Sequence, residues 1–149
     1  MRLTRLTRVI NTYITTTEFK AFAKIVSTED LQTILNTAID KIEAITNISL
    51  QAGTFRLESD SSLEHKLYYN VSEVTSVTND LGESVSYTLN SLKNRIYLTD
   101  ESELIISYSV ATTEDLCKSL KHYVYEYASA LYDGQDGMIV LNKVPRNIC

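Results

Sequence analysis

Few residues in this sequence have the type and spacing that catalysis or metal binding requires. The histidines are His65 and His122, and the cysteines are Cys117 and Cys149. The sequence has no Cys-x-x-Cys or His-Glu-x-x-His motif, no glycine-rich phosphate loop and no Gly-x-Ser-x-Gly turn. We therefore predict that the protein is not an enzyme and that it binds no metal and no cofactor. The histidines are interpreted as surface or boundary residues and Cys117 as a small buried side chain, while the state of Cys149 stays open.

Two acidic segments are the remaining candidates for chemistry. Residues 133–137 (DGQDG) resemble a calcium loop only loosely, because an EF-hand needs acidic or Asn side chains at alternate positions and a final Glu. A helix end followed by a turn explains both glycines without an ion. Asp100, Glu101 and Glu103 are predicted to form a hairpin tip. That tip is either a solvated turn or, if the protein forms a ring, a surface that faces the channel.

Charge is distributed unevenly along this chain of net charge −5. Residues 1–26 carry a charge of +4, whereas residues 27–111 contain thirteen acidic and five basic residues. Tight binding of nucleic acid needs several Lys or Arg side chains on one face. The acidic residues 27–111 therefore argue against a nucleic-acid-binding protein. The basic residues Arg2, Arg5 and Arg8 form either an arm that becomes ordered on a partner or a frayed end.

Two helices are predicted in the first third of the chain, where apolar residues recur every three or four positions. The first covers about residues 16–25, because Thr15 and Glu18 have the spacing of a capping box. The second follows Ser27 as its N-cap and stops at Asn47.

A third helix is predicted near the C-terminus. It opens after Thr112 or Thr113 and stops near Gly134, which can adopt the left-handed conformation that ends helices. Its apolar stripe includes Tyr123 and Tyr127. Because a buried tyrosine hydroxyl needs a partner, this stripe suits a subunit interface as well as a core.

Between the second and third helices the apolar period changes to two, and β-branched and aromatic residues dominate. The predicted strands are 54–58, 66–71, 73–79, 84–89, 95–98 and 104–110. Turn signals at 80–83, 90–94 and 99–103 indicate an antiparallel meander. We therefore predict an α+β fold: an antiparallel helical core of three main helices, an inserted small antiparallel β-sheet, and extended N- and C-terminal arms.

The length of 149 residues suits a single domain. Its predicted parts are an N-terminal arm (1–14), a helical core (15–47 and 112–133), a β-rich insert (50–110) and a C-terminal tail (134–149). Two cysteines are too few for a disulfide scaffold, which favours a reducing compartment. No apolar run approaches the ~20 residues that cross a bilayer, and no signal peptide is expected. We expect synthesis in the cytosol and no membrane partner.

Several short sequence segments, taken in their order along the chain, resemble those of a known protein family. The helical ones are residues 15–22 (TTTEFKAF), 29–35 (EDLQTIL) and 114–120 (EDLCKSL). The strand phrases and the final segment are 74–77 (VTSV), 87–89 (YTL), 95–98 (RIYL), 104–108 (LIISY) and 144–146 (VPR). In their order and spacing, over about residues 15–146, the chain resembles the head-to-tail connector (adaptor) proteins of tailed bacteriophages.

The resemblance implies a structural virion protein rather than an enzyme. Such proteins form a ring below the portal, usually of twelve copies, which extends the DNA channel and offers a platform for the tail or for a stopper (neck) protein. DNA would pass through without sequence-specific binding, because an acidic wall repels phosphate. The implied location is the virion neck between capsid portal and tail, with assembly in the host cytoplasm.

Three groups of residues are assigned to contacts in such a ring. A head-to-tail ring needs two complementary faces on each chain, and Arg2, Arg5 and Arg8 are expected to contact the adjacent subunit. Asp100, Glu101 and Glu103 are the candidates for the channel wall. The tail is too apolar to hang free, so it is expected to dock on a neighbour, the portal. Its candidate residues are Met138, Ile139, Val140, Leu141, Val144, Pro145 and Arg146.

A second hypothesis comes from another class of protein, a monomeric β-rich binding module that recognises a carbohydrate or a peptide. Its ligand would stack on a sheet face that carries tyrosines. The candidate tyrosines are Tyr68, Tyr69, Tyr87, Tyr97 and Tyr108. The two hypotheses differ in behaviour, because a connector self-associates or binds a portal ring, whereas a binding module stays monomeric.

Overall fold

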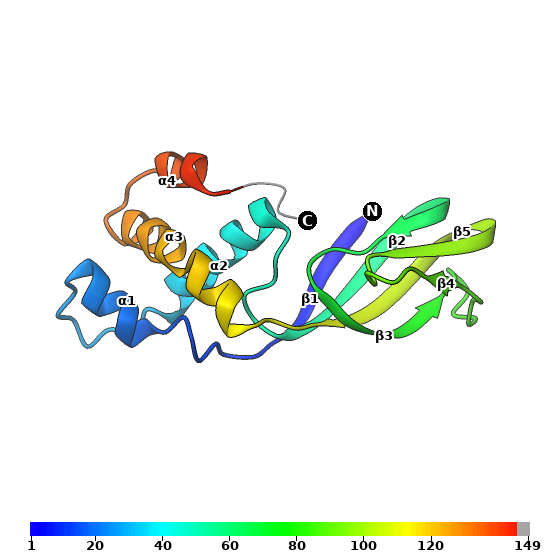
Figure 1. Ribbon diagram of the computed structural model, residues 1–149, viewed down its shortest axis with the longest axis horizontal. Helices are drawn as coiled ribbons and strands as arrows, with labels where there is room; N and C mark the ends of the chain where they lie inside the picture. The colour runs from blue at the N-terminus through cyan, green and yellow to red at the C-terminus, as the bar shows by residue number, and fades with distance from the viewer. Residues whose placement is uncertain (146–149) are drawn as a thin grey trace. The chain divides into compact units, whose positions relative to one another are not determined.

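The computed structural model describes residues 1–145 of the chain and divides it into two compact units. The β unit consists of Met1–Ile10 and Gln51–Thr112. The helical unit consists of Asn11–Leu50 and the chain from Thr113 onward. Figure 1 shows the strands in one unit and the helices in the other. The predicted α+β fold is confirmed.

The first helix, α1, spans Thr16–Ala23 and begins where the sequence predicts. The Thr15 hydroxyl accepts a hydrogen bond from the Glu18 N–H at 3.2 Å, which satisfies one of the backbone donors left open at a helix start. The helix ends at Lys24, which has a left-handed φ of 57°.

The second helix, α2, spans Gln32–Thr46 and begins later than predicted. The expected N-cap, Ser27, is wrong, because its hydroxyl accepts the Glu29 N–H at 3.0 Å within a turn before the helix. Asp30 instead accepts the N–H of the first helical residue at 3.0 Å. Short polar side chains bond to nearby backbone in turns as readily as at helix caps. The predicted stop is confirmed, since Asn47 has a left-handed φ of 57°.

The third helix, α3, spans Glu114–Tyr132, and a short fourth helix, α4, spans Met138–Lys143. The Thr113 hydroxyl caps α3 by accepting the Leu116 N–H at 3.2 Å, and Gly134 follows the helix with a left-handed φ of 71°. Both ends of α3 therefore lie where the sequence predicts. α3 contacts each of the other three helices, so it forms the centre of the helical unit.

The core of the helical unit combines residues from all four helices. Leu35, Ile39 and Ile42 of α2 have no exposed surface, and neither have Val124 and Ala128 of α3. These residues recur at three- and four-residue steps, as the faces of two packed amphipathic helices require. The helical unit is thus held by side-chain packing around α3.

Two buried polar side chains fix the loops of the helical unit. The Glu43 Oε2 accepts the Leu50 N–H at 2.6 Å and the Ser49 hydroxyl at 3.2 Å. The Asn11 side chain donates to the Leu50 carbonyl oxygen, and its own Oδ1 accepts the Tyr13 N–H at 2.6 Å. Buried backbone groups outside helices and strands need such partners. These contacts bring the two ends of the segment Asn11–Leu50 together.

The β unit contains five antiparallel strands among the described residues. They are β1 (Arg2–Arg8), β2 (Gly53–Lys66), β3 (Val71–Thr78), β4 (Thr88–Leu89) and β5 (Arg95–Val110). The sheet order is β1-β2-β5-β3, and β4 also pairs with β5. The predicted meander is therefore wrong, because β5 rather than β3 is the neighbour of β2. The antiparallel pairing itself is confirmed.

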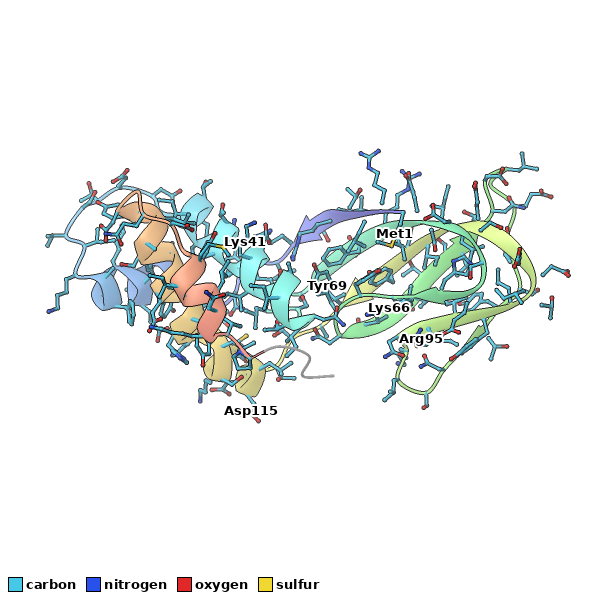
Figure 2. The ribbon with its side chains drawn as sticks, turned by 90° about the horizontal axis from the view of Figure 1, so that it is seen from above. Met1, Lys41, Lys66, Tyr69, Arg95 and Asp115 are labelled. Atoms are coloured by element: carbon cyan, nitrogen blue, oxygen red, sulfur yellow. The ribbon has the colours of Figure 1, made fainter. Side chains whose placement is uncertain are left out.

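The strand boundaries differ from the prediction around residues 66–71. The predicted strand 66–71 does not form: β2 ends at Lys66, Tyr69 has a left-handed φ of 69°, and β3 begins at Val71. Lys66 pairs instead with Arg95 at the start of β5, and Figure 2 labels both residues in the β unit. The predicted turns at 80–83 and 90–94 are confirmed as connections beside β4.

The predicted turn at 99–103 is wrong, because β5 continues through these residues. Pairing with β2 is interrupted there: Ser62 pairs with Ser102, but Glu64 pairs with Tyr97. Leu63 alone thus lies opposite residues 98–101 of β5. The polar residues that signal a turn instead form a bulge in β5. The strand does not reverse there, because β2 runs alongside and pairs with β5 both before and after the bulge.

One face of the sheet is apolar and forms the core of the β unit. Phe55, Tyr108 and Val74 lie on one row across three strands, and Leu57, Ile106 and Val77 lie on the next. The intervening rows are polar, for example Arg56, Ser107 and Ser76. This alternation is the period of two that predicted the strands.

Candidate interaction surfaces

The predicted N-terminal arm is an edge strand of the sheet. β1 pairs with β2 from Arg2 opposite Glu58 to Arg8 opposite Gly53. A side chain at Gly53 would collide with the carbonyl oxygen of Thr7, so the glycine lets β1 approach. Residues 2–8 are therefore ordered on β2 of their own chain, in contrast to an arm that becomes ordered only on a partner.

The three arginines of β1 lie in different surroundings. The Arg5 guanidinium lies 4.8 Å from the centre of the Phe55 ring, in cation–π contact over the apolar face. Arg2 is exposed and Arg8 is half-buried. The basic charge predicted for an inter-subunit contact thus lies at one edge of the β unit.

Exposed apolar side chains follow the same edge. Leu6 is the bulged residue of β1, since Arg5 pairs with Phe55 and Thr7 pairs with Thr54. Leu6 is 54% exposed, and Val9 and Ile10 are 58% and 70% exposed. Exposed large apolar residues that are close in sequence and stand beside basic ones are typical of a protein-binding surface. We call residues 2–10 the β1 edge.

The predicted channel acids lie on the bulge of β5 rather than on a hairpin tip. Asp100, Glu101 and Glu103 are all exposed. Glu103 also lines a hollow of about 340 Å³. The other acidic residues that line the hollow are Glu58, Asp60 and Asp80. This part of the β unit is therefore rich in acidic side chains.

The C-terminal tail packs on the helical unit through α4. Leu141 and Val144 are 8% and 4% exposed and belong to its core, and Val140 is half-buried. These residues therefore pack on their own chain, and the expected docking of the tail on a neighbour stays a prediction for the residues that remain exposed. Of the tail residues predicted to contact a partner, those that remain exposed are Met138, Ile139 and Pro145. Arg146 and Cys149 lie outside the described residues.

Two adjoining hollows form a groove on the helical unit. One, of about 370 Å³, lies between residues 23–27 and the end of α3, and the other, of about 310 Å³, lies among α1, α3 and α4. They share Ser129 and Asp133 as lining residues. Exposed apolar residues that line them are Phe22, Val26, Tyr132 and Ile139. We call this surface the α1–α3–α4 groove.

The α1–α3–α4 groove is acidic as well as apolar. Glu126, Asp133 and Asp136 line it, and Lys24 is the one basic residue among the described residues that do so. Because exposed charges act over about 10 Å at moderate ionic strength, the groove attracts basic partners at close range.

Beside this groove, a hydrogen-bonded pair joins α1 to α3. The Tyr125 hydroxyl donates to the Glu18 Oε2 at 2.7 Å and accepts the Thr15 N–H at 3.2 Å. The hydrogen bond from Tyr125 holds the pKa of Glu18 below its ordinary value despite partial desolvation, and Lys121 adds to this effect. Burial raises the pKa of Tyr125, so its hydroxyl stays a donor.

The histidines differ from each other in burial. His122 is exposed, as expected, but the interpretation of His65 as a surface or boundary residue is wrong, because only 1% of it is exposed. Its Nε2 donates to the Ser62 carbonyl oxygen at 2.9 Å, and the Ser59 hydroxyl lies 2.6 Å from its Nδ1. Both ring nitrogens are therefore engaged in fixing β2, which is a structural role.

Cys117 is buried, as predicted, and its thiol lies 3.6 Å from the Leu50 carbonyl oxygen. Over residues 1–145, no group of three or more His, Cys, Asp or Glu side chains is arranged to hold a metal ion. None of the helices described has the length and hydropathy of a membrane span.

The tyrosines of the binding-module hypothesis do not share one exposed face. Tyr108 has no exposed surface, and Tyr69 packs against Phe55 with ring centres 5.1 Å apart. Tyr87 and Tyr97 are each 40% exposed. A ligand-stacking platform of all five residues is therefore absent from the described β unit.

Sequence reasoning missed two features of these surfaces. The pairing of β1 was not predicted, although Leu3 and Arg5 share one face and Thr4 the other, as in a strand. Tyr125 was also missed, because it lies between the two predicted stripe residues Tyr123 and Tyr127. Its partner Glu18 is distant in sequence, so no local signal pointed to it.

Chains in solved particle structures are similar to this chain over its whole length. A chain in the neck of a native gene transfer agent (GTA) particle, computed with C12 symmetry, has a TM-score of 0.71 and 19% identity. A chain in the neck of an empty GTA particle, computed with C6 symmetry, has a TM-score of 0.68 and 18% identity. Both matches cover 100% of this chain and 97% of the other.

A third similar chain belongs to the virion of a native GTA particle, with a TM-score of 0.65, 18% identity and the same coverage. No family model matches the sequence, and no curated protein matches it. At this level of identity, the similarity establishes a shared fold.

Proposed function

We propose that this chain is a structural protein of the neck of a phage-like particle. The observation that carries the proposal is the full-length similarity to chains in GTA neck structures, which covers 100% of this chain. The surfaces described above agree with such a role, because they carry exposed apolar side chains beside charged ones. Exposed apolar side chains gathered beside charged ones suit binding between proteins.

The chain acts as a head-to-tail connector, a ring of about twelve copies that joins the portal to the tail or to the next neck protein. Support for a ring comes from the C12 and C6 symmetry with which the similar neck structures were computed. A ring requires two different and complementary surfaces on each copy. The basic β1 edge and the acidic α1–α3–α4 groove are two such surfaces.

DNA passes through this ring without sequence-specific binding. The acids on the β5 bulge, Asp100, Glu101 and Glu103, face the channel in the proposed assembly. Their exposure supports this placement, since charged side chains on a channel wall must remain in contact with solvent. Like charge repels the phosphate backbone and lets DNA slide.

The tail contacts the portal through its exposed residues. Leu141 and Val144 are held in the core of the helical unit, and Ile139 and Val140 line the α1–α3–α4 groove, so Met138 and Pro145 are the described candidate residues left for that contact. The expected location is the virion neck, with assembly in the host cytoplasm.

Electron microscopy of the chain mixed with portal rings from the same particle tests this function. We expect a collar of added density below the portal. The variant Met138→Asp is expected to reduce collar occupancy at least tenfold, because it places a charge in an apolar contact. Leu92→Asp is the matched control, since Leu92 is 76% exposed and lies on a turn of the β unit. A wild-type chain that stays monomeric and adds no collar contradicts the proposed function.

A further inference from the structure

We propose that the β1 edge of one copy binds the α1–α3–α4 groove of the next copy and forms the head-to-tail interface of the ring. This inference rests on the proposed function and names the two surfaces that meet. Each surface is identified by its own observations, which come from different units of the chain.

The β1 edge binds through side chains rather than by adding a strand. An open strand edge can pair with another strand, but a bulge and charged residues block such pairing. β1 carries a bulge at Leu6 and has three arginines among its seven residues. Its exposed apolar side chains, Leu6, Val9 and Ile10, therefore need a groove rather than another strand.

The groove gathers most of the exposed apolar surface of the helical unit. Among the described residues of that unit, six large apolar side chains are exposed, and four of them line the groove. Val26 is 99% exposed and Ile139 is 73% exposed. Exposure of this extent is costly in water and is relieved when a partner covers the groove.

Charge selects the β1 edge as the occupant of the groove. The groove is lined by Glu126, Asp133 and Asp136, and the β1 edge carries three arginines and no acid. Two other exposed apolar residues of the β unit stand directly beside acids, Leu63 beside Glu64 and Leu81 beside Asp80, and Leu92 stands alone on a turn beside Lys93. The acidic groove would repel the segments of Leu63 and Leu81, and the Leu92 turn offers one apolar side chain where the β1 edge offers three. Complementary charge of this kind sets orientation and register between subunits.

An interface between two different surfaces has a predictable consequence for assembly. Each copy offers one β1 edge and one groove, so contacts repeat from copy to copy until the ring closes. A copy with a defective edge can still bind the edge of a neighbour in its own groove. A copy with a defective groove can still insert its own edge into the groove of a neighbour. Mixing these two kinds of copy produces dimers that cannot grow.

Mixing defective copies tests the interface. In the full chain, Val9→Asp and Ile139→Asp are each expected to weaken self-association at least tenfold, measured by analytical ultracentrifugation. An equimolar mixture of the two variants is expected to give dimers and no larger species. Leu81→Asp is the matched control, because Leu81 is 78% exposed on a turn of the β unit and belongs neither to the β1 edge nor to the lining of the groove. It is expected to assemble like the wild type.

Disulfide trapping provides a second measurement. In a Cys149→Ser background, the pair Val9→Cys and Ile139→Cys is expected to give a ladder of covalent oligomers on oxidation. The pair Leu81→Cys and Ile139→Cys is expected to give none. A disulfide confined to the monomer overturns the proposal, because the edge would then occupy the groove of its own chain.

The outcomes separate this inference from the proposed function. Rings or portal collars that persist in both aspartate variants overturn the interface and leave the neck function standing. Dimers in each single variant alone also overturn the interface, because they indicate a symmetric contact. A wild-type chain that forms neither rings nor collars contradicts both proposals.

Discussion

The β unit and the helical unit hold the described terminal elements of the chain by different forces. β1 is attached to β2 by backbone pairing, and Gly53 lets the two backbones approach. α4 is attached by side-chain packing, and Gly137 lets it approach the ring of Tyr127. Both elements belong to segments that were predicted as arms.

This difference determines which side chains remain for partners. Backbone pairing uses the N–H and C=O groups of the main chain, so the side chains of Leu6, Val9 and Ile10 in the β1 edge stay exposed. Packing of a short helix uses its apolar side chains, so α4 gives Leu141 to the core and keeps Ile139 outside. Pairing as a strand thus fixes a terminal element while its side chains stay available to bind a neighbour.

The largest expected effect comes from shortening a buried side chain in either of the two cores. Leu35→Ala in the helical unit and Ile106→Ala in the β unit each remove a side chain with no exposed surface. Each is expected to lower the free energy of unfolding by about 2–5 kcal/mol. Hydrogen exchange followed by mass spectrometry is expected to show faster exchange mainly in the mutated unit.

Val26→Ala and Leu81→Ala serve as controls, because both side chains are almost fully exposed. They are expected to change the free energy of unfolding by less than about 0.5 kcal/mol. Equal loss of protection in both units after either core substitution would show that the units unfold as one.

An intermediate effect is expected at the two attachment glycines. In Gly53→Ala the new methyl group meets the backbone of Thr7, which cannot move without breaking the pairing of β1. In Gly137→Ala it meets the ring of the Tyr127 side chain rather than backbone, so relief does not require a strand pairing to break. We expect losses of about 1–3 kcal/mol for Gly53→Ala and less for Gly137→Ala, measured by urea denaturation.

Hydrogen exchange distinguishes the two glycine variants further. Gly53→Ala is expected to expose the amides of β1, and Gly137→Ala those of α4. The comparison of attachment modes fails if Gly137→Ala is the more destabilising of the two.

The smallest effect is expected from the bond between α1 and α3. Tyr125→Phe removes the hydrogen bond to Glu18 and is expected to cost about 0.5–1 kcal/mol at pH 7, since the Glu18 side chain is half-exposed. The pKa of Glu18 is lower in the folded chain than its ordinary value of 4.5. The stabilisation is therefore present above pH 4.5 and is lost as the pH falls through the folded pKa.

Urea denaturation between pH 3 and pH 7 measures this dependence. The difference between the wild type and Tyr125→Phe is expected to shrink toward acidic pH. Tyr97→Phe, a half-exposed tyrosine of the β unit, is the control and is expected to show no such trend. A difference that does not change with pH would mean that the Thr15 contact, rather than Glu18, carries the effect.

The helix boundaries were the most predictable part of the fold. Thr15, Thr113 and Asn47 act within four residues of themselves, so the sequence nearby contains all that decides these caps. Ser27 is the exception, because both Ser27 and Asp30 can accept a backbone N–H in this segment. Ser27 does so in the turn before α2, and Asp30 does so at the start of the helix. Its failure is also local in origin.

The candidate surfaces were predictable in composition but not in arrangement. The sequence identified the basic segment around Arg5, the acids around Glu101 and the apolar residues around Leu141. It placed all three on arms or turns, because an isolated short segment shows no partner. In the structure these segments are an edge strand, a bulge within a long strand and a core-packed helix.

Sequence by itself determined the helices, the strand-forming character of the insert and the uneven charge, since each depends on residue type and short-range period. Only the tertiary structure decided the sheet order, the pairing of β1 with β2 and the contact of Tyr125 with Glu18. The pairs that set the strand order β1-β2-β5-β3 and the Tyr125–Glu18 contact join residues from 27 to 107 positions apart. Hydrogen bonds and packing between such distant residues depend on what the whole chain can satisfy together, and no local pattern records that choice.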